Sequence, residues 1–260
     1  MSEARSLAFA RPVRAGERIF VGAGACPGFP AACVADLCGL PVGAVLQSGG
    51  RDLLRILSVS WNSAGASAAS GRVVLAEALE DIPAGDVTAE AVSRGPALAW
   101  ITLSDKGAAG KRHDESGPLI AELVGEKLGL RYAQGFILPD DERQLRALLV
   151  DLALVQGFDF IMTTGGTGVA PRDVTPEATL SVIEKRLPGF ERAMTAASLA
   201  KTPHGAVSRA VAGTLGGAII VNMPGSPKAV RECLAPLLPT LGHTMDKLHG
   251  DPSDCATLRC

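Results

Sequence analysis

The chain has 260 residues, of which 47% are hydrophobic, and its formal net charge is −2. The hydrophobic content and a mean hydropathy of +0.24 argue against global disorder, and the length is comfortable for two domains. The sequence holds no dense basic run of the kind that binds nucleic acid. It also has no stretch that reaches the roughly 20 apolar residues of a membrane-spanning helix.

The arginine-rich residues 5–18 are not followed by the apolar core of a secretory signal, and Glu3 and Glu17 interrupt the basic character of a mitochondrial presequence. We therefore expect a cytoplasmic protein without membrane contact. The six cysteines form no C-x-x-C pair, and no histidine lies near the first three. A zinc site is not predicted, and reduced thiols are expected at Cys26, Cys33, Cys38, Cys233, Cys255 and Cys260.

Residues 1–95 are predicted to form a small β-rich domain. This part of the chain contains arginine but no lysine, and the first lysine is Lys106, which supports a boundary near Gly95. Residues 62–71 have the Gly/Ala/Ser-rich composition of a loop or flexible linker. Short apolar runs between turn residues indicate strands, and they lie at Arg18–Val21, Ala44–Leu46, Leu53–Val59 and Arg72–Leu79.

From Ala97 the pattern changes to apolar strands that alternate with helices. Continuous apolar runs are typical of buried parallel strands, and we expect them at Ala97–Leu103, Arg131–Leu138, Phe158–Met162 and Gly217–Val221. Helical spacing of apolar residues predicts helices at Pro118–Leu128, Asp141–Gln156, Thr175–Arg186, Gly189–Ala200 and Pro227–Leu238. Residues 96–250 are therefore predicted to be a three-layer α/β domain, a parallel or mixed sheet with helices on both faces. A tail of residues 251–260 follows.

The third predicted strand runs directly into the loop Thr163-Thr-Gly-Gly-Thr-Gly168. Glycine lets main-chain N–H groups approach a ligand closely. Thr175-Pro176 is predicted as the N-cap and first residue of the next helix, whose positive end favours an anion. The loop lacks both the lysine of a P-loop and the spacing of a dinucleotide-binding turn. It is predicted to bind phosphate, with an ordinary tight turn as the alternative.

Charged residues follow several of these strands, and they are expected to meet because ligands bind outside the carboxyl ends of parallel strands. Arg172 can pair with a bound anion, while Asp140 and Asp173 can hold a Mg²⁺ ion. Local roles stay open for the same residues. Asp140 or Asp141 can cap the following helix, and Asp173 can close an Asx turn.

Seven segments stand in order along residues 97–250: Thr102-Leu-Ser-Asp105, Asp114-Glu-Ser-Gly117, Leu138-Pro-Asp-Asp-Glu142, Thr163-Thr-Gly-Gly-Thr-Gly168, Arg172-Asp-Val-Thr-Pro-Glu-Ala178, Pro188-Gly-Phe190 and Asn222-Met-Pro-Gly-Ser-Pro-Lys228. In this combination they resemble the molybdopterin adenylyltransferases of molybdenum-cofactor biosynthesis. The resemblance implies an enzyme that uses Mg²⁺ and ATP, transfers AMP to molybdopterin and releases pyrophosphate.

The resemblance assigns catalysis and metal binding to Asp140 and Asp173. It implies substrate or nucleotide contacts for a wider set, namely Ser104, Asp105, Asp114, Ser116, Thr164, Gly165, Gly166, Thr167, Gly168, Arg172, Asn222, Pro224, Gly225 and Ser226. Simpler roles stay open, because residues 104–105 can merely end a strand, residues 114–116 can be a charged loop, and residues 222–226 can be an ordinary turn. Lys106 stands where many relatives have arginine, and an ammonium cannot make arginine's bidentate anion contact.

A homo-oligomer, specifically a trimer, is also implied, with a molybdenum-insertion protein as a partner. Two other functions of the same fold stay open: a scaffold that binds molybdopterin without transfer, and a competence-damage-type nucleotide hydrolase. Residues 1–95 are similar in pattern to the sulfur-carrier domain (MOSC) that some relatives place ahead of the transferase, and a β domain of unknown role is the alternative. A carrier would need a reactive thiolate among Cys26, Cys33 and Cys38, and Cys26 lies in the most turn-like surroundings.

Overall fold

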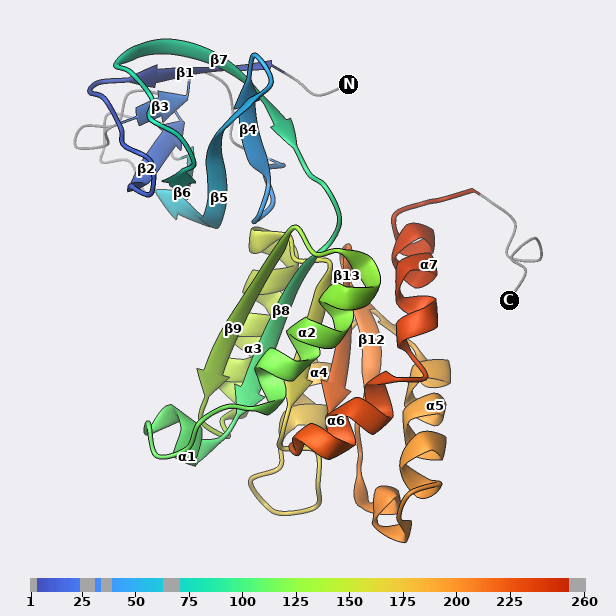
Figure 1. The fold of residues 1–260 in the computed structure, drawn as a ribbon. Helices are drawn as coiled ribbons and strands as arrows, with labels where there is room; N and C mark the ends of the chain where they lie inside the picture. Colours follow the sequence, from blue (N-terminus) through green and yellow to red (C-terminus); the bar gives the residue numbers. More distant parts are fainter. Residues whose placement is uncertain (1–3, 24–30, 34–38, 63–70, 253–260) are drawn as a thin grey trace. The chain divides into compact units, whose positions relative to one another are not determined.

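The computed structural model describes residues 4–23, 31–33, 39–62 and 71–252. Its contacts divide the chain into two compact units. The first consists of Met1–Ala97 with Val155–Gly157, and the second of Leu98–Leu154 with Phe158–Cys260. Each unit has its own sheet system and its own buried core (Figure 1).

The first unit is a closed barrel, with neighbouring strands in the order β1-β3-β2-β6-β5-β4-β7. Alternate residues of its strands point inward, such as Leu7 and Phe9 of the first strand, and fill the barrel with apolar side chains. β2 and β3 pair in parallel, and the other recorded pairs are antiparallel. The prediction of a small β-rich domain is confirmed. The strands are β1 (Ala4–Phe9), β2 (Arg18–Ala23), β3 (Ala31–Cys33), β4 (Val45–Ser48), β5 (Arg51–Asn62), β6 (Gly71–Ala78) and β7 (Gly85–Val92).

The second unit is built on a six-stranded sheet in the order β11-β12-β13-β10-β8-β9. β10 pairs in parallel with β8 on one side and with β13 on the other, and every residue of β10 is buried. β12 and β11 continue the sheet in antiparallel pairing. The sheet is therefore mixed, as predicted. Its strands are β8 (Ala97–Leu103), β9 (Tyr132–Leu138), β10 (Phe160–Thr164), β11 (Lys185–Arg186), β12 (Ala212–Leu215) and β13 (Ala218–Met223).

Helices cover both faces of this sheet. Ile120, Met194, Val230 and Leu241 come from four different helices and share one core with the sheet residue Phe160. These helices are α2 (Ser116–Leu128), α5 (Pro188–Leu199), α6 (Pro227–Leu234) and α7 (Leu238–Leu248). On the other face α3 (Glu142–Val150) packs against α4 (Thr175–Leu180), behind the sheet in Figure 1. No helix in the described ranges is both long and apolar enough to cross a membrane.

Three of the predicted helices have different bounds in the structure. The helix predicted at 175–186 ends at Leu180, because the chain then joins the sheet through Glu184 N–H to Thr214 O at 2.8 Å. The helix predicted at 141–156 changes to π-helix over Asp151–Gln156. The helix predicted at 227–238 breaks into α6 and α7, because proline at 236 lacks the N–H that would continue α6.

Candidate active site

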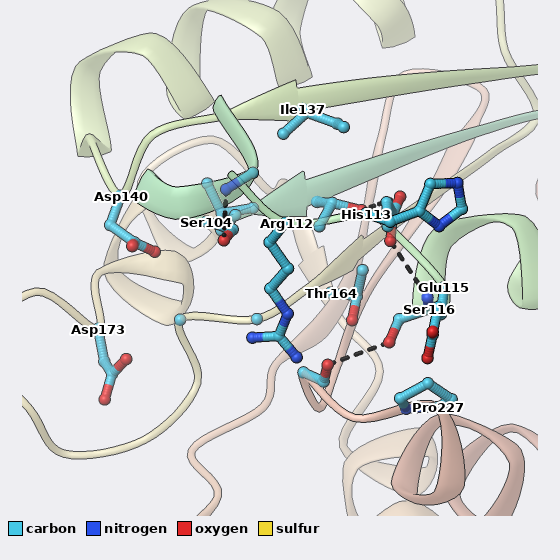
Figure 2. Close-up of a pocket in the computed structure, with 17 residues that line it drawn as sticks. Ser104, Arg112, His113, Glu115, Ser116, Ile137, Asp140, Thr164, Asp173 and Pro227 are labelled. Atoms are coloured by element: carbon cyan, nitrogen blue, oxygen red, sulfur yellow. Dashed lines mark hydrogen bonds between the residues drawn. The ribbon is translucent and has the colours of Figure 1, made fainter. Parts of the chain in front are cut away.

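The carboxyl ends of β8, β10 and β13 open into a pocket of about 490 Å³ (Figure 2). The strand register sets Thr164 of β10 beside Thr102 of β8 and beside Met223 of β13, so that segments distant in sequence end side by side. The volume lies in the range of small-molecule sites. The pocket is lined by Thr102, Leu103, Ser104, Gly107, Arg112, His113, Asp114, Glu115, Ser116, Ile137, Asp140, Thr164, Gly165, Gly166, Asp173, Gly225 and Pro227.

The glycine loop that follows β10 requires glycine for two reasons. Gly165 and Gly166 have φ angles of +95° and +62°, which other residues rarely adopt. A Cβ at Gly165 would also lie 2.5 Å from the main-chain oxygen of Leu103, and a Cβ at Gly166 would lie 2.4 Å from Thr175 Oγ1. Gly165 therefore lets two backbones meet, and Gly166 leaves room for the Thr175 hydroxyl, so both glycines bring main chain to the pocket wall.

Thr175 holds the glycine loop and does not cap the next helix. Its hydroxyl donates to Gly165 O at 2.9 Å, and its N–H donates to Gly166 O at 3.1 Å. The N-cap of α4 is Val174, whose side chain makes no capping bond, so the predicted N-cap at Thr175 is wrong. The residue already lies within the first turn of α4, and its hydroxyl is directed to the carbonyl of the loop.

Two aspartates at the pocket edge bind each other's main chain. Asp140 N–H donates to Asp105 Oδ1 at 3.2 Å, and Asp105 N–H approaches Asp140 Oδ2 at 3.4 Å. Arg172, predicted to meet a bound anion, instead donates to Asp105 Oδ1 at 2.7 Å and to Asp140 O at 3.2 Å. Arg172 offsets the charge of Asp105, which does not line the pocket. The aspartates that do line it are Asp114, Asp140 and Asp173.

Asp140 is held in an environment that disfavours its charged form. Burial raises its pKa, the nearby charges of Asp105 and Asp173 raise it further, and the Asp105 N–H and Arg172 oppose the shift. A shifted carboxyl in a cleft is typical of functional sites. Its Oδ1 lies 3.6 Å from the place a Cβ would take on Gly166, so the carboxylate borders the glycine loop.

The structure shows which aspartates have the local roles left open by the sequence, namely capping of α3 and an Asx turn. Asp141, and not Asp140, caps α3 by accepting from Gln144 N–H at 2.9 Å, and this hydrogen bond lowers the pKa of Asp141. Asp173 Oδ2 accepts from Ala170 N–H at 2.8 Å, upstream in the chain, whereas an Asx turn would bond a residue downstream. Asp140 is therefore free of the capping role, and Asp173 keeps a loop in shape while lining the pocket.

The predicted residues at the start of α1 and α2 line the pocket while they hold its walls. Asp114 Oδ1 accepts from the N–H groups of Ser116 at 3.1 Å and Gly117 at 3.0 Å, and its Oδ2 accepts from the Thr102 hydroxyl at 2.7 Å. Ser116 Oγ donates to Gly225 O at 3.0 Å. Ser104 caps the short helix α1 (Asp105–Ala108). These bonds tie β8 and α2 to the loop after β13.

Seven predicted contact residues do not line the pocket. Asn222 is fully buried, where its amide donates to Thr163 at 3.0 Å and to Thr179 at 2.9 Å and accepts from Val211 N–H at 3.2 Å. Asn222 therefore joins β13 to α4 and does not face the cavity. The residues outside the lining are Asp105, Thr167, Gly168, Arg172, Asn222, Pro224 and Ser226.

That Arg112 and His113 line the pocket was not predicted from the sequence. Arg112 extends into the middle of the cavity and His113 lies at its rim (Figure 2). Arg112 is exposed, and its guanidinium has no recorded hydrogen bond or ion pair with any residue in the described ranges. The run Lys111-Arg112-His113 directly before the Asp114 motif was the available signal. Arg112 thus brings positive charge into the cavity that Asp140 and Asp173 also line.

Comparison with known proteins identifies the family. The family described as "Probable molybdopterin binding domain" matches residues 99–243, more than half of the chain. The chain belongs to this family. The resemblance expected over about residues 97–250 is thereby confirmed, and the matched range contains every residue that lines the pocket.

Proteins related to this chain match about 60% of its length. The molybdopterin adenylyltransferase of Helicobacter pylori strain J99 is 38% identical over 155 residues, which are 59% of this chain and 88% of that protein. The molybdenum cofactor synthesis protein cinnamon of Drosophila melanogaster is 37% identical over 153 residues, which are 59% of this chain and only 26% of that protein. The molybdopterin biosynthesis enzyme MoaB of Thermus thermophilus superposes with a TM-score of 0.55 at 39% identity, covering 61% of this chain and 99% of that structure.

Proposed function

We propose that this protein transfers AMP from ATP to molybdopterin, with Mg²⁺ as the metal and pyrophosphate as the leaving group. One observation carries the proposal: Asp140 and Asp173 line the same pocket as the glycine loop, at the carboxyl ends of three parallel strands. The named activity of the Helicobacter pylori relative, which aligns over 88% of its length, agrees with this reaction.

The phosphate groups of the two substrates need donors and positive charge. The glycine loop brings main chain to the pocket wall at Gly165 and Gly166, and main-chain N–H groups in such a turn can donate to phosphate oxygens. Arg112 reaches the same space with a planar guanidinium that matches phosphate oxygens bidentately. In the proposed complex these groups hold the triphosphate and offset the negative charge that develops on the departing pyrophosphate.

The donor set fits a Mg²⁺ ion. Asp140 and Asp173 supply carboxylate oxygens, the ligands this cation prefers, and Mg²⁺ is usually held by one or two carboxylates together with substrate phosphates. The described residues contain no cluster of three or more acidic, cysteine or histidine side chains that could hold a metal by themselves. A Mg²⁺ ion held by these carboxylates would supply charge neutralisation for the phosphates.

The two other functions considered for this fold differ in what the pocket must do. A scaffold needs to bind molybdopterin but has no use for a pocket-edge carboxylate, Asp140, whose charged form is disfavoured by burial. A nucleotide hydrolase would need no acceptor substrate. The names of the aligned relatives support the transferase.

The decisive assay measures pyrophosphate release by the full chain from ATP and Mg²⁺, with and without molybdopterin. Asp173→Asn keeps the shape of the side chain and removes a charge, and we expect a loss of about a thousandfold in rate with the thermal midpoint unchanged. Asp246→Asn on α7 serves as the control and should retain full activity. A wild-type chain that binds molybdopterin without releasing pyrophosphate would favour the scaffold. An Asp173→Asn rate above about a tenth of wild type would remove the metal role from that residue.

We further propose that residues 96–250 are the catalytic domain and that it works as a homo-oligomer, specifically a trimer, with a molybdenum-insertion protein as the partner that receives the adenylylated product. The buried core of this domain draws on β10, β13 and four helices within that range, which supports its independence. The number of copies is measurable by light scattering.

A further inference from the structure

Arg209 reaches both ends of the loop that presents Asp173. This loop, residues 168–173, connects the glycine loop to α4. Arg209 N–H donates to Thr167 O at 2.9 Å, and its Nε donates to Gly168 O at 2.7 Å. Its Nη2 donates to Asp173 O at 2.7 Å, and its Nη1 pairs with the Glu177 carboxylate on α4. One side chain therefore binds the first residue of the loop, the last residue of the loop and the helix beyond it.

Besides Arg209, the loop is held by Arg172, which binds Asp105 and Asp140, and by hydrogen bonds within the loop. Ala170 and Asp173 bind each other through Ala170 N–H to Asp173 Oδ2 at 2.8 Å and Asp173 N–H to Ala170 O at 2.9 Å. Val169 at its tip is 72% exposed and so adds little packing. The loop contributes no residue to the apolar core of the unit. Its shape thus depends on polar contacts. Those that reach outside the loop are the bonds from Arg209 and the bonds of Arg172 to Asp105 and Asp140.

We propose that Arg209 is a positioning residue that fixes the carboxylate of Asp173 in the pocket. Arg209 does not line the pocket, so it acts through the loop and not on a ligand. Its planar guanidinium presents N–H groups in a rigid fork, which suits two carbonyl oxygens and a carboxylate at once. The catalytic consequence rests on the proposed function, whereas the effect on the loop does not.

Two substitutions of Arg209 and two control substitutions test whether Arg209 positions Asp173 or merely stabilises the fold. Arg209→Ala removes all three side-chain contacts. Arg209→Lys keeps the charge beside Glu177, but a single ammonium cannot span Gly168 O and Asp173 O together, and we expect an intermediate effect. Glu177→Gln keeps both carbonyl bonds of Arg209 and should behave like the wild type. Arg186→Ala is the matched control, since Arg186 pairs with Glu191 at 2.8 Å elsewhere in the same unit.

The first measurement is hydrogen exchange of the full chain without ligands. In Arg209→Ala the amides of residues 168–173 should exchange at least about tenfold faster, while those of β10 and β13 keep their wild-type protection. The second is the Mg²⁺ dependence of pyrophosphate release. A displaced ligand should raise the Mg²⁺ concentration at half-maximal rate and lower kcat by about a hundredfold, with a smaller change in the KM for ATP.

Each outcome of these measurements either supports or overturns the role proposed for Arg209. Local exchange, a shifted Mg²⁺ dependence and partial recovery in Arg209→Lys support the proposal. Unchanged exchange in residues 168–173 overturns it, and so does faster exchange spread equally over β10 and β13, which would mean general destabilisation. If the wild-type chain shows no transfer activity while the exchange effect stays local, the proposed function fails and the control of the loop by Arg209 survives.

Discussion

At the scale of single residues, Asp140 is placed where its charge works against folding. Burial and the charges of Asp105 and Asp173 raise its pKa. A carboxyl whose pKa is higher in the folded than in the unfolded state stabilises the fold below the unfolded pKa, and this contribution is lost as the pH rises through the folded pKa. At neutral pH the ionised Asp140 therefore lowers the free energy of unfolding. Functional groups often carry such a cost.

We predict that Asp140→Asn raises the thermal midpoint at pH 7 in metal-free buffer while it abolishes transfer. The amide cannot ionise but keeps an oxygen for the Asp105 N–H. The difference from wild type should shrink as the pH falls towards the ordinary aspartate value of about 3.9. Calorimetric scans across this pH range measure both effects.

Asp141 is a neighbouring control, because its pKa is shifted in the opposite direction from that of Asp140. Its pKa is lowered, chiefly by the hydrogen bond from Gln144 N–H, so its contribution to stability is present at neutral pH and is lost as the pH falls through its folded pKa. Asp141→Asn should therefore lower the midpoint at pH 7. If Asp140→Asn lowers the midpoint as well, the burial argument for Asp140 is wrong.

The sequence could propose aspartates for the site but could not separate their roles. Asp140 and Asp141 are adjacent, and either fits an N-cap by residue type. The distinction depends on the extended backbone of Asp141, which turns its carboxylate to the helix. Arg172 and Asp105 belong to loops after different strands, and their ion pair becomes visible only once the sheet brings those loops together. Non-local pairing of this kind leaves no local pattern.

At the scale of secondary structure, Trp100 of β8 lies between two glycines from neighbouring elements. A Cβ on Gly117 of α2 would lie 2.0 Å from Trp100 Cδ1, and a Cβ on Gly135 of β9 would lie 2.3 Å from Trp100 Cε2. The Gly117 position also lies 2.4 Å from Asp114 Oδ2, the oxygen that binds Thr102. The indole thus sets how closely α2 approaches the sheet next to the pocket.

We predict that Gly117→Ala lowers the free energy of unfolding by about 1–3 kcal/mol, the usual cost of overpacking. The same change should alter the fluorescence of Trp100 and weaken substrate binding, because Asp114 must move. Gly189→Ala in α5 is the matched control, since a Cβ there has no neighbour within 4 Å, and it should be neutral or slightly stabilising. Equal denaturation midpoints for the two variants would contradict the close packing at Trp100.

Elements with a strong local pattern were predictable and those defined by pairing were not. β8 and β10 are continuous apolar runs, and the structure places both within two residues of the predicted bounds. β11 has only two residues, both exposed, and exists because β12 offers it main-chain partners. In the barrel, β7 consists mostly of polar or small residues and pairs with β1 and β4. β11 is too short to carry a hydrophobic period. In β7 the residues that alternate toward the barrel core are Val87, Ala89 and Ala91, a weak period made mostly of alanine.

At the scale of the whole molecule, the structure gives the strand order of the barrel, and a sulfur-carrier role is the hypothesis for its function. Cys26 and Cys38 lie outside the described residues, and Cys33 is in β3. The sulfur-carrier hypothesis therefore stays a prediction, as does the alternative of a β domain with another role. Cys233, by contrast, is buried in the core of the second unit, where burial raises the pKa of its thiol. Cys233 is therefore a packing residue.

The last prediction is that residues 97–250 suffice for catalysis. All pocket-lining residues fall within this range, and so does the apolar core that joins α2, α5, α6 and α7 to the sheet. Because that core needs no residue of the barrel, the fragment should fold cooperatively and keep kcat within about threefold of the full chain, an energy difference below about 1 kcal/mol.

The measurements are a thermal scan, the pyrophosphate assay and light scattering of both proteins at equal concentration. Light scattering should give the mass of a trimer for the fragment. Asp173→Asn introduced into the fragment is the control, and it should abolish the fragment's activity as it does in the full chain. A folded fragment that is inactive while the full chain works would show that the barrel takes part in the reaction. A fragment that is active as a monomer would instead show that catalysis does not require oligomerisation.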